Sequence, residues 1–334
     1  MCDTTASAGS EAQEAGVCGT EAVIVTGAHR SGTTLLGDIL SRDQHTWTVW
    51  EPFNRHWGLA GVEGAYPFLR ASDADRPPVS SLARYLRTGR ARWSANRGST
   101  GPDFPQLRAI GKTLRRHVLW RREGHKVPVV KDPFALLALG ALQGVLGSRP
   151  AIVSVRHPCA WVTSLRRMGW PAGHELNDLL EQEELYELHL KDLLPRRNWT
   201  KADDLEAGAR AWACLYHMVR EQSRAGAQVL VVPIEAYGRE PVATMSRMFS
   251  EVGLRRPADL ASIAEHYSGS SVVTPDAGTK HLLQRNSRAL NEAWKSKLTS
   301  QEARRVRSIT EPVFEAFYSD WESAEASLSD SLTL

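Results

Sequence analysis

The sequence predicts an α/β protein built on a doubly wound parallel sheet of about five strands with helical inserts. Short apolar runs, rich in β-branched residues, are separated by longer helical stretches and cover residues 22–26, 46–50, 127–130, 151–155 and 229–232. The runs do not alternate apolar and polar residues, which is typical of strands covered on both faces, as in a parallel sheet. The helical stretches supply the crossover connections that parallel strands need.

The composition is that of a globular chain with a sizeable core. The 334 residues are 42% hydrophobic and 24% charged. Lys plus Arg number 41 and Asp plus Glu 38, so the net charge of +3 gives no reason to expect nucleic-acid binding. No run of about 18 apolar residues and no basic-then-apolar leader exists, so we expect no membrane span and a cytoplasmic protein. The Ala- and Arg-rich composition indicates a bacterial source.

We expect one domain over residues 21–321, preceded by a disordered leader (1–20) and followed by a flexible tail (322–334). Both ends are rich in small, polar or acidic residues without apolar periodicity. Two helical inserts interrupt the rhythm of strands and helices, near 55–126 and 172–205. The later part of the first insert is rich in arginine, which makes it either a solvated helical face or a wall that attracts an anionic substrate or cofactor.

A glycine-flanked loop, residues 27–34, follows the first strand directly and leads into a helix. In that context the glycines let the backbone curl, so that its amides and the helix N-terminus converge on an anion. The spacing is close to the G-x-x-x-x-G-K-[ST] of P-loop NTPases, but Thr33 stands at the lysine position and Arg30 carries the positive charge. We therefore predict a P-loop NTPase-like sheet whose loop is an anion cradle and not a nucleoside triphosphatase loop.

The run R-S-G-T-T-L-L, which begins at Arg30, resembles the 5′-phosphosulfate loop of sulfotransferases that use 3′-phosphoadenosine 5′-phosphosulfate (PAPS). The arginine, where cytosolic members carry lysine, is similar to the carbohydrate-type branch of the family. The resemblance implies that the cofactor is contacted by the loop residues His29, Arg30, Ser31, Gly32, Thr33 and Thr34.

A second motif resembles the family's 3′-phosphate site, with Arg156 after the fourth strand and Ser164 eight residues later. An arginine fork together with a hydroxyl suits a phosphate monoester. The stretch 279–298 resembles the family's late basic loop, which implies Lys280 and Arg285 as further contacts of the 3′-phosphate. Ile234 stands where some members have a tyrosine that contacts adenine. The resemblance covers roughly residues 21 to 320, apart from the helical inserts.

Sulfuryl transfer needs cations at the leaving 5′-phosphate and a base at the acceptor. Arg30 and the loop amides meet the first need, and Lys131, directly after the third strand, points to the same crevice. Cytosolic relatives place a histidine base two residues after this lysine, a base that the run Lys131-Asp132-Pro133 lacks. The carbohydrate-type branch implies Glu51, directly after the second strand, as the general base.

The roles of the acidic and basic residues near the strand ends leave alternatives open. Glu51 could instead pair with an arginine and shape the mouth of the site, which would leave His157 or Asp132 as the base. His157 stands where the family usually has aspartate. Trp47, Trp50, Trp57 and Trp170 are candidates for lining the acceptor pocket.

The sequence thus predicts a PAPS-dependent sulfotransferase, without a metal, that transfers a sulfuryl group to a hydroxyl of a small-molecule acceptor such as a specialised metabolite, sugar or lipid-like molecule. One alternative is a P-loop small-molecule kinase that uses ATP–Mg²⁺ and holds the metal with Asp132. Another is a nucleotide-binding scaffold whose basic insert recruits a partner. Thr33 at the lysine position and the Arg156–Ser164 pair disfavour the kinase. The sequence predicts no particular oligomeric state.

Overall fold

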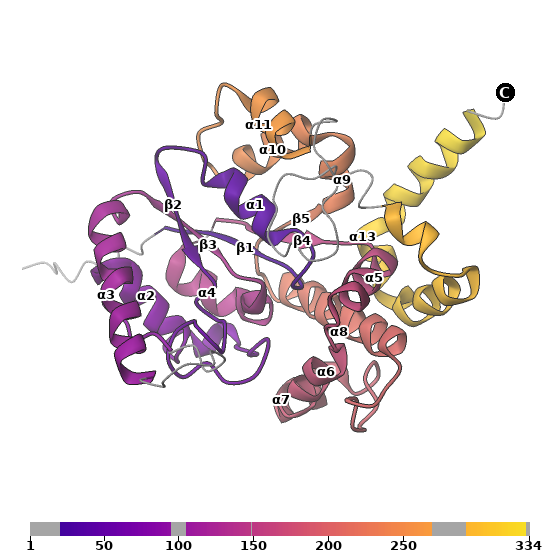
Figure 1. Ribbon diagram of the computed structural model, residues 1–334, viewed down its shortest axis with the longest axis horizontal. Helices are drawn as coiled ribbons and strands as arrows, with labels where there is room; N and C mark the ends of the chain where they lie inside the picture. The colour runs from indigo at the N-terminus through magenta and orange to yellow at the C-terminus, as the bar shows by residue number, and fades with distance from the viewer. Residues whose placement is uncertain (1–20, 95–104, 148, 269–291, 332–334) are drawn as a thin grey trace, which may run out of the picture.

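The chain forms the predicted five-stranded parallel sheet (Figure 1). The computed structural model describes residues 21–94, 105–147, 149–268 and 292–331. The strands lie in the order β2-β3-β1-β4-β5, and each neighbouring pair is parallel. Their bounds are β1 (Val23–Thr26), β2 (Thr46–Trp50), β3 (Val127–Lys131), β4 (Ala151–Val155) and β5 (Val229–Pro233). Each lies within one residue of an apolar run, so the predicted fold class is confirmed.

Helices connect the strands and cover the sheet on both faces (Figure 1). In chain order they are α1 (Thr33–Leu40), η1 (Ala71–Asp73), α2 (Val79–Thr88), α3 (Pro105–Glu123), η2 (Pro133–Ala138), α4 (Leu139–Leu146), α5 (Pro158–Met168), α6 (Ala172–Leu180), α7 (Glu183–Leu185), η3 (Tyr186–Leu190), α8 (Asp204–Arg224), α9 (Ile234–Arg239), α10 (Pro241–Glu251), α11 (Leu260–Ser268), η4 (Ala293–Ser296) and α13 (Ser300–Ser331).

Successive strand residues point into two separate cores, one on each face of the sheet. Val23 and Val25 of β1 belong to the core that α1, α10 and α11 close. Ile24, between them, belongs to the larger core that α2, α4 and α8 close. Because both faces are buried, both sets of positions are mostly apolar, which explains the continuous apolar runs.

The strand order brings the residues after each strand to one crevice. From β1 the chain passes to the edge strand β2, returns to β3 between them, and then crosses to β4 on the other side of β1. In open α/β sheets ligands bind at the carboxyl ends of the strands where this order reverses. The loop after β1 lies at this switch point, with the ends of β3 and β4 beside it.

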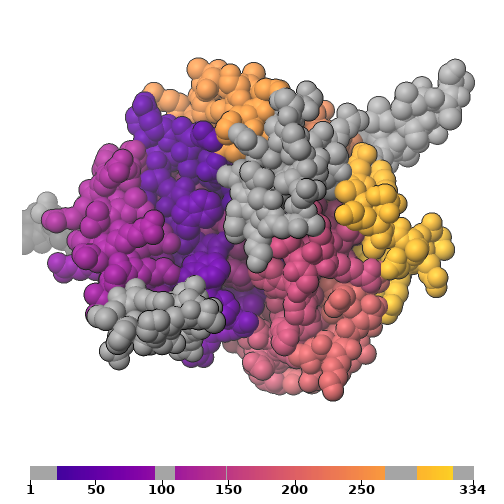
Figure 2. All heavy atoms as spheres, viewed as in Figure 1, coloured from indigo at the N-terminus to yellow at the C-terminus, as the bar shows by residue number. Residues whose placement is uncertain are grey.

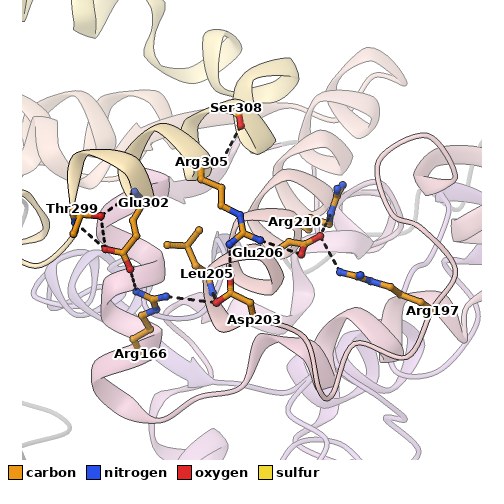
Figure 3. Close-up of polar contacts among 10 residues, drawn as sticks. All are labelled: Arg166, Arg197, Asp203, Leu205, Glu206, Arg210, Thr299, Glu302, Arg305 and Ser308. Carbon is orange, nitrogen blue, oxygen red and sulfur yellow. Dashed lines mark hydrogen bonds and ion pairs between the residues drawn. The ribbon is translucent and has the colours of Figure 1, made fainter.

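Ion pairs join α13 to α5 and to the start of α8 (Figure 3). Arg166 of α5 contacts Glu302 at 2.9 Å, and Arg305 of α13 contacts Asp203, the N-cap residue of α8, at 2.6 Å. Exposed ion pairs contribute little to stability individually, commonly about 0–1 kcal/mol. We therefore interpret this network as fixing the position of α5, which carries Ser164, more than as a source of stability.

The two expected inserts contain η1, α2 and α3 between β2 and β3, and α6, α7 and η3 before α8. The segment 322–334, expected to be a flexible tail, is helical as far as Ser331 because α13 continues into it. Its Ala and Glu residues are good helix formers. The leader, residues 1–20, lies outside the described residues. Among the described helices, none has the length and apolar content to cross a membrane.

Candidate active site

The loop between β1 and α1 is tied to the protein through its carbonyl groups. The carbonyls of residues 28–31 each accept a hydrogen bond from a side chain. The donors are, in order, the Ser31 hydroxyl, the Trp161 indole, the Arg156 guanidinium and the Ser154 hydroxyl, at 2.5, 2.6, 3.2 and 2.6 Å. With its carbonyls engaged in this way, the loop is left with the amides at the start of α1 for binding an anion.

Those amides belong to the first turn of α1, where no preceding helical carbonyl can accept from them. In the described part of the chain, the N-cap of α1 is Gly32 and no side-chain hydrogen bond caps it. Together with the helix dipole, amides in this position bind phosphate and sulfate groups. The predicted anion cradle therefore has the necessary local geometry in the residues Gly32, Thr33 and Thr34.

Two glycines are required by the path of this loop. Gly27 has φ +145°, and a Cβ there would lie 2.2 Å from the Ser154 carbonyl oxygen. Gly32 has φ +101°, and a Cβ there would lie 2.6 Å from Cδ1 of Ile234. Ile234, which stands where some family members have a tyrosine, thus packs against the loop itself. Arg30 also has a positive φ, 66°, a strained conformation of the kind that occurs at ligand-binding loops.

Arg156, directly after β4, reaches the loop through its bond to the Arg30 carbonyl. The indole of Trp212 holds the Arg156 carbonyl at 2.8 Å. Ser164 lies two turns along α5 and is 4% exposed, and its hydroxyl has no hydrogen-bond partner among the described residues. Buried hydroxyl groups without a partner are uncommon, so this one is suited to a ligand oxygen.

Lys280 and Arg285, the other two predicted contacts of the 3′-phosphate, lie outside the described residues.

Glu51 and Lys131 meet at the ends of the neighbouring strands β2 and β3. The Lys131 ammonium donates to Oε1 of Glu51 at 2.6 Å, and the Asn54 amide donates to Oε2 at 2.9 Å. The Lys131 side chain is 3% exposed and that of Glu51 17%, so the carboxylate is the part of the pair that solvent reaches. Among the described residues, the ion-pair partner of Glu51 is Lys131 and not an arginine.

Asp132, one of the two reserve bases, joins the segment after β2 to the end of β3. Its two carboxyl oxygens accept from the Phe53 amide at 2.5 Å and from the Phe134 amide at 2.8 Å. Complete burial raises the pKa of this carboxyl to about 7, although both hydrogen bonds act in the opposite direction. The geometry assigns Asp132 to holding the backbone of the site.

His157, the other reserve base, is packed among aromatic rings. Its ring stacks on Trp294, with 5.0 Å between the ring centroids and 6° between the planes, and meets Phe314 edge-on. Burial, followed by the charges of Arg307 and Lys295, lowers the pKa of His157 to about 3. The imidazole is therefore neutral at physiological pH, and its backbone amide donates to a buried carboxyl oxygen of α9 at 2.9 Å.

The side chain of His29 lies in a buried cluster behind the loop. Its ring stacks on Trp170 at 4.6 Å, and its Nδ1 lies 2.6 Å from the Tyr66 hydroxyl, which also accepts from the His29 amide at 3.1 Å. Glu175 of α6 completes the cluster, with Oε1 at 3.1 Å from the Trp170 indole nitrogen. The cluster links the insert that contains α6 to the loop after β1.

Glu175 and His29 form a neutral pair, although their separation of 3.4 Å is that of an ion pair. Burial raises the pKa of Glu175 to about 8. Burial, and next the charge of Arg30, lowers the pKa of His29 to about 3. Each group is therefore uncharged at pH 7, and the contact is a dipolar one. Both side chains are almost fully buried, which disfavours the charged form of each.

Several residues of the site were not predicted from the sequence. Asn54 lies in the turn after β2, and Tyr66 and Glu175 come from the inserts, where no local pattern marks them. Trp161 and Trp212 lie in helices, and their indoles donate to the carbonyls of His29 and Arg156. A signal was present for Asn54 alone, since it follows Glu51 by three residues in a turn.

The four tryptophans considered for an acceptor pocket lie in different surroundings. Trp47 is 5% exposed, whereas Trp57 and Trp170 are 38% and 40% exposed. Trp47 and Trp50 line a cavity of about 540 Å³ between β2 and α3. Basic residues of α3 line the same cavity, so part of the arginine-rich stretch is a wall, while Arg121 and Arg122 remain on an exposed face.

Comparison with known proteins gives structural similarity without sequence similarity. No protein-family model and no curated protein matches the chain. The sulfotransferase domain from the curacin biosynthetic pathway is 13% identical with a TM-score of 0.46, covering 86% of this chain and 96% of that one. The sulfotransferase domain of the Synechococcus PCC 7002 olefin synthase is 16% identical with a TM-score of 0.42, and the match covers 86% of this chain and 92% of that one. Sulfotransferase STF9 from Mycobacterium avium is 16% identical with a TM-score of 0.39, and the match covers 89% of this chain and 77% of that one.

These similar structures are sulfotransferases, the family that the loop and the Arg156–Ser164 pair resemble. Because the identities are 16% or lower and the TM-scores are below 0.5, the functional argument depends on the chain's own residues.

Proposed function

We propose that this chain is a PAPS-dependent sulfotransferase that transfers a sulfuryl group to a hydroxyl of a small-molecule acceptor, with Glu51 as the general base. The observation that carries the proposal is the construction of the loop after β1. Its four carbonyls are engaged by side chains, the N-terminal amides of α1 are left without helical acceptors, and Arg156 stands beside it. Such a loop binds an anion without the lysine of a nucleoside triphosphatase.

The residues present fit PAPS at both of its charged ends. The amides at the start of α1, with Arg30, would hold the 5′-phosphosulfate. Arg156 and the unpartnered hydroxyl of Ser164 would hold the 3′-phosphate. PAPS supplies an activated sulfuryl group when it is bound, and the protein's part is to orient the reactants and stabilise the charge that develops.

Glu51 is placed to take the proton of the acceptor hydroxyl. An ionised carboxylate offers about four lone-pair sites, and the bonds from Lys131 and Asn54 use one on each oxygen. The two donors fix the orientation of the carboxylate while leaving lone pairs for an incoming hydroxyl. A positioned base of this kind contributes roughly 10²–10⁴-fold to the rate. Lys131 brings its positive charge to the same strand ends, next to the loop.

The kinase alternative is not favoured. Asp132, the residue that would hold Mg²⁺, is fully buried and bonded through both oxygens to backbone amides. In the part of the chain that the structure describes, no group of three or more His, Cys, Asp or Glu residues is arranged to hold a metal. That the reaction needs no metal stays a prediction. The scaffold alternative gives no role to the Glu51–Lys131 pair beside the loop.

Calorimetric titration with 3′-phosphoadenosine 5′-phosphate (PAP), the product of the reaction, tests the proposal. AMP and ATP–Mg²⁺ serve as comparators. We expect PAP to bind at micromolar concentration or below and AMP to bind at least about tenfold more weakly, because it lacks the charged group that Arg156 and Ser164 would contact. Preference for ATP–Mg²⁺ over PAP would reject the proposal in favour of the kinase.

A further inference from the structure

The cavity between the edge strand β2 and α3 combines an aromatic floor with a cationic wall. It encloses about 540 Å³, and its lining includes Trp47 and Trp50 from β2 and Lys112, Arg116 and Leu119 from α3. Figure 2 shows the surface of α3 directly against that of residues 21–94, the segment that contains β2. This volume is within the range of pockets that hold small ligands, about 300–1,000 Å³.

The cations of this wall have no acidic partner among the residues that the structure describes. Within the described part of the chain, Lys112, Arg115 and Arg116 form no ion pair with a carboxylate. Glu123, the acidic residue in the lining, is already paired with two other basic side chains at 2.9 and 2.8 Å. Burial, and then the charge of Arg116, lowers the pKa of Lys112 to about 8. Lys112 and Arg116 are partly buried and Arg115 is exposed, and neighbouring cations without an ion-pair partner favour the binding of an anion.

One end of the cavity adjoins the proposed base. Arg116 donates from Nη2 to the Trp50 carbonyl at 3.3 Å and lies over the Trp93 ring at 4.8 Å, so its guanidinium is fixed on both sides. The ring of Trp50 lies on the other side against the Lys131 ammonium, at 5.2 Å. Trp50 is therefore shared between the cavity and the Glu51–Lys131 pair, and Glu51 contributes electrostatically to the surroundings of Arg116.

We propose that this cavity binds the acceptor, and that the acceptor is a hydroxylated small molecule with an apolar or aromatic body and an anionic group, a carboxylate or a phosphate. The inference rests on the proposed function and names the substrate class of the same site. The cations of α3 would bind the anionic oxygens, which both groups share. The body would lie against Trp50 and Leu119, and the hydroxyl would lie toward Glu51.

Three phenols of matched shape test the inference. They are 4-hydroxybenzoate, 4-hydroxyphenyl phosphate and the neutral 4-hydroxybenzyl alcohol, titrated calorimetrically into the protein saturated with PAP. We expect at least one of the two anionic phenols to bind about tenfold more tightly than the alcohol, and the order of the two distinguishes a carboxylate from a phosphate acceptor. Equal affinity for the alcohol and both anions, or no binding of either anion at millimolar concentration, would overturn the inference.

Paired variants separate a built site from a general effect of charge. The double variant Lys112→Gln/Arg115→Gln removes two charges from the wall, whereas Arg84→Gln/Arg87→Gln removes two from exposed positions of α2, outside the lining of the cavity. We expect the first to weaken the favoured anionic phenol about tenfold or more, with the alcohol unchanged, and the second to change neither. The same loss in both variants would mean that net charge, not the cavity, attracts the anion.

The titration with PAP keeps this inference apart from the proposed function. Failure of the unmodified protein to bind PAP would reject the sulfotransferase proposal together with its acceptor. PAP binding that is intact in every variant, with no preference for an anionic phenol, would reject the acceptor class alone. Intact PAP binding also shows that the glutamine variants are folded.

Discussion

The loop after β1 and the segment after β2 form the two sides of the same crevice, but they are built differently. Four consecutive loop carbonyls are tied to buried side chains, and both glycines of the loop are closely surrounded. After β2, the carboxylate of Glu51 is reached by solvent, and the neighbouring Trp57 is 38% exposed. A rigid cradle suits a ligand of one fixed shape, and an open side suits an acceptor whose shape the inserts determine.

The difference assigns separate effects to the two sides. Changes on the loop side should alter nucleotide binding or stability, and changes on the β2 side should alter turnover or acceptor affinity. A variant on the β2 side that altered nucleotide binding, or one on the loop side that altered acceptor affinity alone, would contradict this division.

The largest effect is expected for Glu51→Gln. Sulfuryl transfer from labelled PAPS to an acceptor found among hydroxylated small molecules should slow by roughly 10²–10⁴-fold, because the amide cannot take the proton. The dissociation constant of PAP should stay the same. Glu63→Gln is the control. Glu63 lies at an exposed position in the insert that follows β2, and the variant should retain full turnover. A large loss of PAP affinity in Glu51→Gln would place Glu51 among the nucleotide contacts.

Gly27→Ala tests the rigidity of the loop side. The new Cβ would lie 2.2 Å from the Ser154 carbonyl oxygen at a backbone φ of +145°, which an alanine rarely adopts. We expect the free energy of unfolding to fall by about 3 kcal/mol or more, measured from urea midpoints, with loss of PAP binding. Gly111→Ala in α3 is the control, because a Cβ there meets nothing within 4 Å. It should stabilise the protein by up to about 1 kcal/mol. Equal midpoints for the two variants would contradict the account.

Glu175→Gln should change how stability depends on pH. The pKa of Glu175 is about 8 in the folded protein against an ordinary 4.5, so the native state keeps a proton that the unfolded chain releases. Stability from this group is complete below pH 4.5 and is lost as the pH rises toward 8, by at most ~1.4 kcal/mol per pH unit. The variant cannot ionise.

The measurement for Glu175→Gln is the urea midpoint across that pH window, in the variant and in the unmodified protein. The difference between the two should shift in favour of the variant as the pH rises. Parallel curves would show that Glu175 is not protonated in the native state. His29, whose pKa is lowered from 6.5 to about 3, stays neutral in the native state, whereas the unfolded chain binds a proton on this histidine below pH 6.5. It therefore favours folding as the pH rises from 4.5 to 6.5, but it does so in both proteins and cancels in the difference between them.

The sequence contained enough information for the sheet and the loop side, and much less for the other side. Apolar runs predicted all five strands because both faces of a parallel sheet must be apolar. The loop and Arg156 could be predicted because each follows a strand immediately, so their places are set by local chain geometry. The sequence likewise predicted that Glu51 and Lys131 each follow a strand. That their side chains meet depends on the order of the strands in the sheet.

The rest of the site depends on contacts between segments that are distant in the sequence. Tyr66 and Glu175 reach His29 from separate inserts, and no periodicity or motif in either insert indicates that meeting. The roles of Trp161 and Trp212 follow from which carbonyl each indole meets. Such pairings are properties of the folded chain, and no local pattern around either tryptophan indicates them.

The central claim is that Arg156 and Ser164 bind a 3′-phosphate, and one calorimetric series tests it most directly. PAP and AMP are titrated into the unmodified protein, Ser164→Ala and Arg156→Ala, with Arg167→Ala, an exposed residue of α5, as the control. We predict that the preference for PAP over AMP falls about tenfold in Ser164→Ala and further in Arg156→Ala, and is unchanged in Arg167→Ala. Affinity for AMP should be unchanged in Ser164→Ala, since its hydroxyl makes no hydrogen bond to another described residue. An undiminished preference for PAP in both variants would contradict the account.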